Sequence, residues 1–181
     1  QALRRDGARV GDDVWVSGTL GDAALALAAM KKQVAISHRE REPLERRLHA
    51  PAPRVAVGER LREIARSAID VSDGLLADLG HSCERSRVAA VIEFARIPRS
   101  AVMERHLERP VARTALLAGG DDYELCFTAG RAQREVIARL GRRLRLKLTL
   151  IGRIVRRRRG TALVTVLGDD GKPMRLALTG F

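Results

Sequence analysis

The chain has 181 residues, 45% of them hydrophobic and 31% charged, which is typical of one globular domain with its own core and too short for two comfortable ones. Because aromatic residues amount to only 3%, the core must consist mainly of Leu, Val, Ile and Ala, and no apolar run is long enough to predict a membrane-spanning helix. The net charge of +12 suggests anionic ligands, while two cysteines without metal-site or disulfide spacing, Cys83 and Cys126, favour a reduced, cytoplasmic setting.

The chain opens with a charged stretch, Arg4–Asp6, which resembles a connection between two domains. We therefore expect residues 1–12 to be an interdomain connector and residues 13–181 to form the domain. We also expect a further domain to precede Gln1 in the complete protein.

The first predicted elements are a strand over Val14–Val16, a Gly-containing loop over Ser17–Asp22, and a helix over Ala23–Lys32. Elements in this order can hold a phosphate on the backbone amides of the loop. The loop lacks both the dinucleotide fingerprint and the Gly-Lys-Ser/Thr ending of a P-loop. A tight turn that requires glycine is the favoured interpretation.

Two helices are predicted next, over Arg39–Leu48 and Val55–Arg66, and the prolines of the segment Pro51–Pro53 force an extended link between them. The second helix has an apolar side formed by Val57, Leu61, Ile64 and Ala65. It leads into Ser67–Leu76, the most informative stretch of the chain.

This stretch predicts a short strand that runs directly into a helix. Ile69 and Val71 alternate as in a buried strand, but Asp70 lies between them, where strands rarely tolerate aspartate. Ser72 and Asp73 stand where a helix takes its cap, ahead of an apolar helix that continues to about residue 84.

Two chemical interpretations of Asp70 and Asp73 remain open at this point. Carboxylates beside a buried strand are costly unless something positive neutralises them, and oxygen ligands at this spacing suit Mg²⁺, which takes one or two carboxylates plus substrate phosphates. The structural alternative is that Asp73 is an ordinary N-cap and that Asp70 accepts a hydrogen bond from a loop amide.

A strand is predicted over Val88–Phe94, and a helical region over Val111–Ala118 leads to the second notable stretch, Gly119–Thr128. Its two glycines allow a sharp turn and the close approach of a ligand, and Asp121 and Asp122 add two carboxylates. The structural alternative is a Gly-Gly-Asp turn into an edge strand.

The remaining predicted elements are a helix over Ala132–Leu144 and strands over Leu148–Val155, Ala162–Leu167 and Met174–Leu178. The run Arg156–Arg159 is interpreted as a solvated hairpin tip, and the lack of an accompanying aromatic platform argues against nucleic-acid binding. Taken together, the elements predict one α/β (α+β) domain with a mixed β-sheet covered by helices.

The two acidic stretches resemble the C-terminal half of the thiamine-monophosphate kinase family. The resemblance rests on Ile69–Leu75 with Asp78–His81, and on Gly119–Phe127. Three shorter stretches fit the same family in the same order, namely Gly7–Asp12, Val16–Asp22 and Pro51–Arg54. Related enzymes of this superfamily (aminoimidazole ribonucleotide synthetase, selenophosphate synthetase and the hydrogenase-maturation dehydratase) carry different sequences at the two acidic positions.

The resemblance implies a fold like the C-terminal domain of aminoimidazole ribonucleotide synthetase. It also implies ATP-dependent phosphorylation of thiamine phosphate to thiamine diphosphate, assisted by Mg²⁺. By motif match, Asp70 and Asp73 would be metal ligands, Ser72 would contact ATP, and Asp121 and Phe181 would contact thiamine phosphate. The family active site lies between this domain and an N-terminal domain, which in relatives also supplies a homodimer contact.

Two departures from the family pattern are visible. The family usually has Glu at the position of Asp121, so a contact there would be one methylene shorter and could be bridged by water. Family members also run a few residues beyond the position of Phe181, so that this ring would lie at a frayed end.

Elementary chemistry agrees with the resemblance. A phosphate monoester is already largely ionised near neutral pH, with a second pKa of about 6, so the attacking oxygen needs no general base and none is assigned. The task is to hold two polyanions together and neutralise the transferred phosphoryl group.

Two alternatives are kept: another ATP-using enzyme of the same superfamily, and a basic nucleic-acid-binding module. The second would bind RNA or DNA through Arg156–Arg159 with strong salt dependence, but it leaves the acidic stretches unexplained. If the kinase interpretation holds, we expect the isolated chain to fold but to have negligible activity, because the metal ligands of the N-terminal domain are missing.

Overall fold

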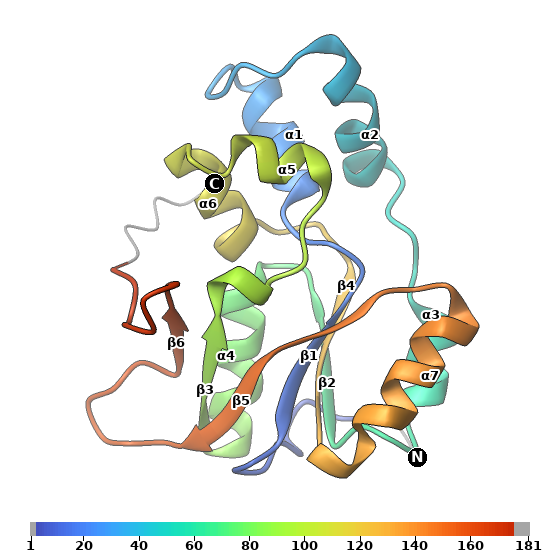
Figure 1. Cartoon of the computed structure of the whole chain (residues 1–181), viewed down its shortest axis with the longest axis vertical. Coiled ribbons are helices and arrows are strands. Elements are labelled where there is room, and N and C mark those ends of the chain that lie inside the picture. Colours follow the sequence, from blue (N-terminus) through green and yellow to red (C-terminus); the bar gives the residue numbers. More distant parts are fainter. Residues whose placement is uncertain (1–2, 176–181) are drawn as a thin grey trace.

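Six strands form one mixed sheet in the computed structural model, which describes residues 3–175 (Figure 1). The strands lie in the order β2–β4–β1–β5–β3–β6, with β3 and β6 parallel and the other neighbours antiparallel. Their bounds are β1 Asp13–Ser17, β2 Ser67–Val71, β3 Val88–Glu93, β4 Glu124–Ala129, β5 Leu148–Arg156 and β6 Val164–Leu167. The predicted fold class, an α/β (α+β) domain with a mixed sheet covered by helices, is confirmed.

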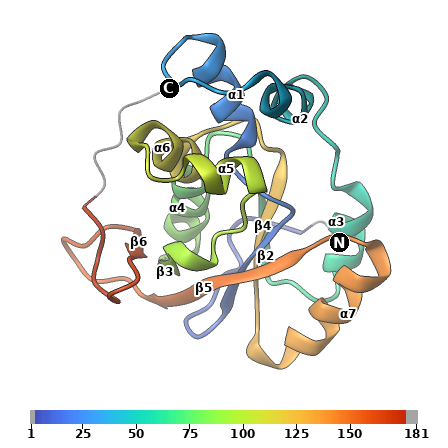
Figure 2. The same ribbon diagram turned by 45° about the horizontal axis from the view of Figure 1, so that its top comes forward.

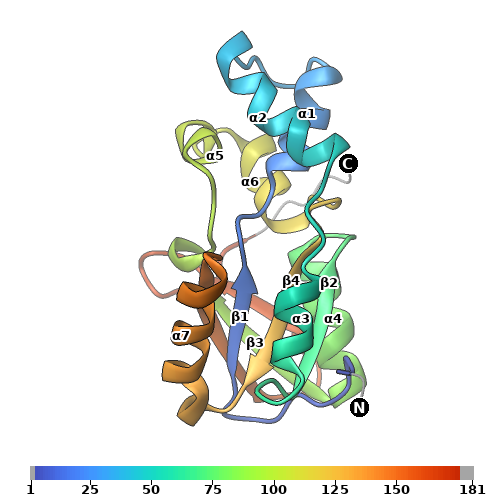
Figure 3. The same ribbon diagram turned by 90° about the vertical axis from the view of Figure 1, so that its right-hand side faces the viewer.

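Seven α-helices surround this sheet within the described residues: α1 Asp22–Met30, α2 His38–His49, α3 Val55–Leu61, α4 Leu75–Ser86, α5 Ala101–His106, α6 Pro110–Ala118 and α7 Arg134–Leu144. Helix α4 packs against one face of the sheet, and α3 and α7 cover the opposite face. The other four gather at one end of the strands (Figure 3).

The alternation of side chains along the strands separates two hydrophobic clusters. In β1, Val14 and Val16 belong to the larger cluster, while Trp15 points to the other face and stacks on Phe127 at a centroid distance of 6.3 Å. The smaller cluster is completed by residues of α3 and α7, among them Val57, Leu61, Ile137 and Leu140. Each helix layer is therefore specified by its own set of apolar positions.

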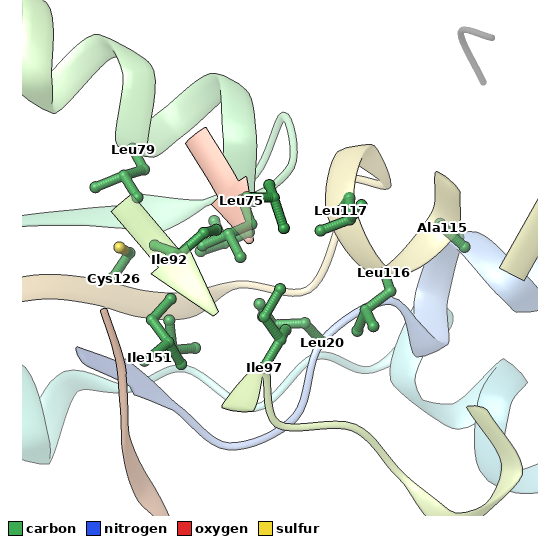
Figure 4. Close-up of a cluster of buried hydrophobic side chains, with 14 of the residues drawn as sticks. Leu20, Leu75, Leu79, Ile92, Ile97, Ala115, Leu116, Leu117, Cys126 and Ile151 are labelled. Carbon is green, nitrogen blue, oxygen red and sulfur yellow. The ribbon is translucent and has the colours of Figure 1, made fainter. Parts of the chain in front are cut away.

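The larger cluster fixes the start of α4. Leu75, the first residue of that helix, is fully buried and lies near Leu117 of α6 and Ile92 of β3 (Figure 4). Full burial of a Leu side chain stabilises a fold by roughly 1.5–3 kcal/mol, so the junction between β2 and α4 is held firmly.

Strand β2 lies at the edge of the described sheet, and β4 lies between β2 and β1. The Gly-Gly-Asp turn therefore leads into an internal strand, so its interpretation as the approach to an edge strand is wrong. The outer edge of β2 is partly covered by the predicted connector, because the amide of Ala68 donates a 3.0 Å hydrogen bond to the carbonyl of Arg4.

The helices differ from the prediction in two respects: one predicted helix is shorter, and one further helix is present. The helix predicted over Val55–Arg66 ends at Leu61, because the chain must turn before Arg66, whose amide already bonds to the carbonyl of Thr128 in β4. Helix α5 was not predicted from its six residues; it begins after Ser100, whose hydroxyl accepts a hydrogen bond from the amide of Met103.

The run Arg156–Arg159 is not a hairpin tip. Strand β6 pairs with β3 rather than with β5, so the chain crosses around the end of β3 between the two strands (Figure 2). Local sequence favours a hairpin here, but the parallel partner of β6 is distant in sequence. The predicted turn over Gly168–Gly171 is present, and Leu167 and Pro173 form a bridge across it.

Of the predicted strand Met174–Leu178, only the first two residues lie within the described part, and neither is in a strand. Among the helices of residues 3–175, none is both long and apolar enough to cross a membrane.

Candidate functional site

The junction between β2 and α4 does not use Asp73 as a helix cap. The residue before α4 is Gly74, whose φ of +106° is accessible chiefly to glycine, and no side chain caps the helix there. The capping group comes from within the helix: Asp78 Oδ2 accepts hydrogen bonds from the amides of Ser72 at 2.9 Å and Asp73 at 3.0 Å. The N-cap interpretation of Asp73 is therefore wrong, and its carboxylate is left available.

A cleft of about 770 Å³ lies beside this junction, and we call it the β2 cleft. It is lined by Leu3–Asp6, Ala68–Asp70, Ser72, Asp73, Asp78, His81, Glu84 and Arg85. Three of the sequence-predicted site residues, Asp70, Ser72 and Asp73, thus share one cleft, because the end of an edge strand and one side of α4 meet there.

Asp70 and Asp73 are exposed, and within the described residues neither carboxylate accepts a hydrogen bond or forms an ion pair. The argument that Asp70 is costly because it is buried is therefore wrong, since an edge strand leaves it open to solvent. Solvent-facing carboxylate oxygens three residues apart in sequence and in one cleft fit a hydrated Mg²⁺ ion well. Within residues 3–175 no three acidic, His or Cys side chains are gathered closely enough to hold a metal by themselves.

Three arginines also line the β2 cleft. Arg4 and Arg5 belong to the segment before β1 and Arg85 to α4, and Arg4 pairs with Asp6 at 2.6 Å. Sequence reasoning assigned the connector no part in the site, because nothing in its composition indicates that it lies along β2. A cleft lined by both carboxylates and guanidinium groups suits a ligand that carries both metal and phosphate.

The second acidic loop lies directly beside the first. The amide of Asp121 donates a 3.0 Å hydrogen bond to the carbonyl of Ser72, and the amide of Tyr123 donates one of 2.9 Å to the carbonyl of Val71. Asp121 is exposed but is not among the residues that line the β2 cleft. The structure thus brings the two predicted motifs together and places Asp121 on the loop next to the cleft.

Two further carboxylates of this stretch are buried and structural. Glu124 accepts two hydrogen bonds from Arg54, at 2.5 and 2.7 Å, one of 2.8 Å from Arg47, and one of 2.6 Å from Ser17. Sequence reasoning missed this cluster, because its partners lie 70–107 residues from Glu124 in the chain. The hydrogen bonds to Glu124 raise the pKa of Arg54.

Asp122 has a strongly raised pKa. Only 3% of it is exposed, and burial, reinforced by the nearby charges of Asp22 and Glu124, raises its pKa to about 8. A hydrogen bond from the amide of Gly21 and the charge of Arg47 act in the opposite direction. Asp122 therefore holds a proton in the folded protein under conditions where an ordinary aspartate has lost it.

The glycine-containing loop Ser17–Asp22 is a tight turn, as the sequence favoured, and not a phosphate cradle. The amide of Gly18 bonds to the carbonyl of Lys147, that of Leu20 to the carbonyl of Pro98, and that of Gly21 to Asp122. These amides are already satisfied by the protein and are not available to a phosphate.

The predicted substrate contact Phe181 lies outside the described residues. The arginines of the crossover loop are exposed, and a shallow hollow there is lined by Arg87, Arg157–Arg159, Gly160 and Thr161. That lining contains no aromatic ring on which a base could stack, which weakens the nucleic-acid alternative.

The sequence was compared with protein families and with curated proteins, and it matches one family and its relatives. Residues 9–165 match the family described as "AIR synthase related protein, C-terminal domain". Over its whole length the chain is 37% identical to the thiamine-monophosphate kinase of Escherichia coli K12, in an alignment of 182 residues that covers 55% of that protein. The chain thus spans about half the length of the curated relatives it matches.

Solved structures give the same result. The thiamine-monophosphate kinase of Stenotrophomonas maltophilia K279a superposes with a TM-score of 0.84 at 49% identity, over 96% of this chain and 54% of that one. A structure of AaThiL complexed with AMPPCP and TMP superposes with a TM-score of 0.75 at 31% identity, over 95% of this chain and 52% of that one.

Proposed function

Because the chain belongs to the AIR synthase related protein family as its C-terminal domain, and is similar throughout to thiamine-monophosphate kinases, we propose that it is the C-terminal half of such a kinase. The full-length enzyme would transfer the γ-phosphoryl group of ATP to the phosphate of thiamine phosphate, giving thiamine diphosphate and ADP. A related structure, AaThiL, was solved with AMPPCP and TMP, which supports this pair of substrates.

One observation carries the proposal: among residues 3–175, the carboxylates of Asp70 and Asp73 have no hydrogen-bond or ion-pair partner, and both residues line the β2 cleft next to the loop of Asp121. Two carboxylates that the fold leaves unpaired, in a protein with a net charge of +12, have no evident role in stability. Their oxygens suit Mg²⁺, which binds through one or two carboxylates and completes its shell with water and substrate phosphates.

The remaining roles follow from the motif match to the family. Ser72 lies between the two metal-binding carboxylates and would contact ATP, and Asp121 would contact thiamine phosphate from the neighbouring loop. Phe181 keeps its proposed contact with the substrate as an expectation from the family. Arg4, Arg5 and Arg85 supply positive charge along the cleft wall.

The chemistry then needs positioning more than proton transfer. Bound Mg²⁺ would neutralise charge on the transferred phosphoryl group. Asp78 keeps the amides of Ser72 and Asp73 turned into the helix, so that their side chains face the cleft. Since the acceptor phosphate is already ionised, no residue of this chain has to act as a general base.

We further propose that the site is completed by the N-terminal half that its relatives possess. The absence of a closed metal cluster among residues 3–175 fits a site whose other ligands come from that half and from the phosphates. The isolated chain should therefore fold but turn over little substrate. Two buried free cysteines fit a reducing, cytoplasmic location, and a homodimer of the full-length protein is expected from the family.

The test is Asp73→Asn in the full-length protein, with Asp169→Asn as the matched control. Asp169 is exposed in a distant turn, so its change should leave activity within about twofold. We expect Asp73→Asn to lower kcat about a hundredfold or more and to raise the Mg²⁺ concentration needed for half-maximal rate, with unchanged thermal unfolding. Equal activity of the two variants would overturn the metal assignment.

A substrate panel and a salt titration separate the alternatives. Turnover of other phosphate acceptors in place of thiamine phosphate would indicate another enzyme of the superfamily. Tight, salt-dependent binding of RNA or DNA that is lost on changing Arg156–Arg159 to Ser would instead favour the nucleic-acid module.

A further inference from the structure

The loop that carries Asp121 has an unusual backbone. Asp121 has a φ of +64° and Tyr123 a φ of +50°, both in the left-handed region that non-glycine residues rarely occupy, whereas the residue between them points inward. Asp121 and Tyr123 consequently project together to the outside, where the Tyr123 hydroxyl approaches Asp121 Oδ1 at 3.5 Å. Such a strained arrangement persists only where the surrounding structure holds it.

Asp122 is the residue that points inward. Its Oδ2 accepts a 2.7 Å hydrogen bond from the amide of Gly21, and its Oδ1 has no partner within the described residues. Gly21 itself cannot shift easily, because even a Cβ added there would lie 2.8 Å from the Cα of Leu116. The Asp122 side chain is thus tied to a rigid point at the start of α1.

The same loop is bonded on its other side to the end of β2, through the amides of Asp121 and Tyr123. The acceptors are the carbonyls of Ser72 and Val71, which adjoin the carboxylates of the β2 cleft. The position of Asp121 relative to the cleft is therefore set by two supports: backbone bonds to β2, and the bond from Asp122 to Gly21.

We propose that Asp122 is a positioning residue for substrate recognition: its bond to Gly21 holds the loop so that Asp121 is presented beside the β2 cleft to the thiamine end of thiamine phosphate. This proposal rests on the proposed function. On the nucleotide side of the site, the amides of Ser72 and Asp73 are held by Asp78 and not by Asp122. Loss of the hydrogen bond between Asp122 and Gly21 should therefore weaken the binding of thiamine phosphate more than the binding of ATP.

The test compares Asp122→Ala with Asp122→Asn in the full-length protein by steady-state kinetics with each substrate varied. The Asn amide oxygen can accept the same bond from Gly21, whereas Ala cannot. We expect Ala to raise the KM for thiamine phosphate about tenfold or more while the KM for ATP stays within about twofold, and Asn to restore the parent value.

A control removes a different buried polar contact of the sheet. Thr128→Val breaks the 2.8 Å contact with Ser67, which lies at the far end of β2 and β4, and should leave both KM values unchanged. If Asp122→Ala does not fold, Asp122→Ser replaces it, because a serine hydroxyl is too short to reach Gly21.

The outcomes separate the two proposals. A parent protein that does not phosphorylate thiamine phosphate overturns the proposed function and, with it, the positioning role. An active parent with unchanged KM values in Asp122→Ala, equal increases for both substrates, or no restoration by Asn overturns the positioning role alone. Failure of Asp122→Ser to fold would likewise overturn it, since Asp122 would then serve stability only.

Discussion

Gly120 lies so close to Ser72 that a Cβ added to Gly120 would sit 2.3 Å from the Ser72 carbonyl oxygen. That carbonyl is the one that accepts the hydrogen bond from the amide of Asp121. The two acidic loops therefore meet backbone to backbone, and the glycine is needed for the contact rather than for a left-handed turn, since its own φ is ordinary.

Gly120→Ala should push the two loops apart. We expect a loss of about 1–3 kcal/mol in unfolding free energy, typical of overpacking, and at least a tenfold loss of kinase rate in the full-length protein. Gly80→Ala is the matched control, because Gly80 lies in α4 with nothing within 4 Å of an added Cβ. Denaturant unfolding and steady-state assays measure both, and a Gly80→Ala variant as impaired as Gly120→Ala would contradict the argument.

Glu124→Gln should be strongly destabilising. The change leaves Arg47 and Arg54 without their common carboxylate, and breaking a buried ion pair in this way costs about 3–5 kcal/mol. Glu42→Gln removes an exposed pair with Arg46 at 2.9 Å and should cost less than about 0.5 kcal/mol. Urea denaturation compares the two directly, and similar losses would show that the buried cluster does not hold the loop.

Asp78→Ala should lower both stability and kcat, and Asp78→Asn should lower neither. Alanine removes the acceptor for the amides of Ser72 and Asp73, at a cost of about 1–2 kcal/mol, and lets both side chains move, so kcat should fall. The Asn oxygen can still accept from those amides, which makes Asp78→Asn the internal control. Thermal unfolding and kinase assays would refute this role if the two variants behaved alike.

Asp122 should make stability depend on pH. Its pKa is raised from 3.8 to about 8, so between these values the folded protein keeps a proton that the unfolded chain has released. Stability contributed by this group is complete below about pH 4, falls as the pH rises, and levels off above about pH 8, with a slope of at most about 1.4 kcal/mol per pH unit.

Asp122→Asn removes this dependence. The unfolding free energy of the Asn variant should improve relative to the parent from about pH 5 to pH 8, because the Asn side chain does not titrate. Chemical denaturation at several pH values measures the difference. A constant offset across that range would mean that Asp122 is ionised throughout.

Much of the fold and of the site was open to prediction because the deciding patterns are local. The alternation of Leu125 and Phe127 placed β4, and the run from Ile69 to Leu75 placed the strand-to-helix junction that carries Asp70 and Asp73. Gly119 and Gly120 were expected to allow a sharp turn and the approach of a ligand, and the structure shows that Gly120 instead makes room for the backbone of Ser72.

What sequence reasoning missed depends on contacts between distant residues. The support of Glu124 by Arg47 and Arg54 spans 77 and 70 residues, and no local pattern connects those positions. The exposure of Asp70 follows from the edge position of β2, which the sequence of that strand does not reveal. The pairing of β6 with β3 was missed for the same reason, because adjacent strands more often form hairpins.

The strand order has a consequence for how the chain is made. In the described sheet every pairing joins strands that are not consecutive, and Ser17 at the end of β1 meets its partner Glu124 across 107 residues. A ribosome therefore releases β1 long before either of its neighbours exists. Such non-local topologies fold slowly and expose unpaired strands meanwhile, so the nascent chain should depend on chaperones more than a helical bundle of equal size does.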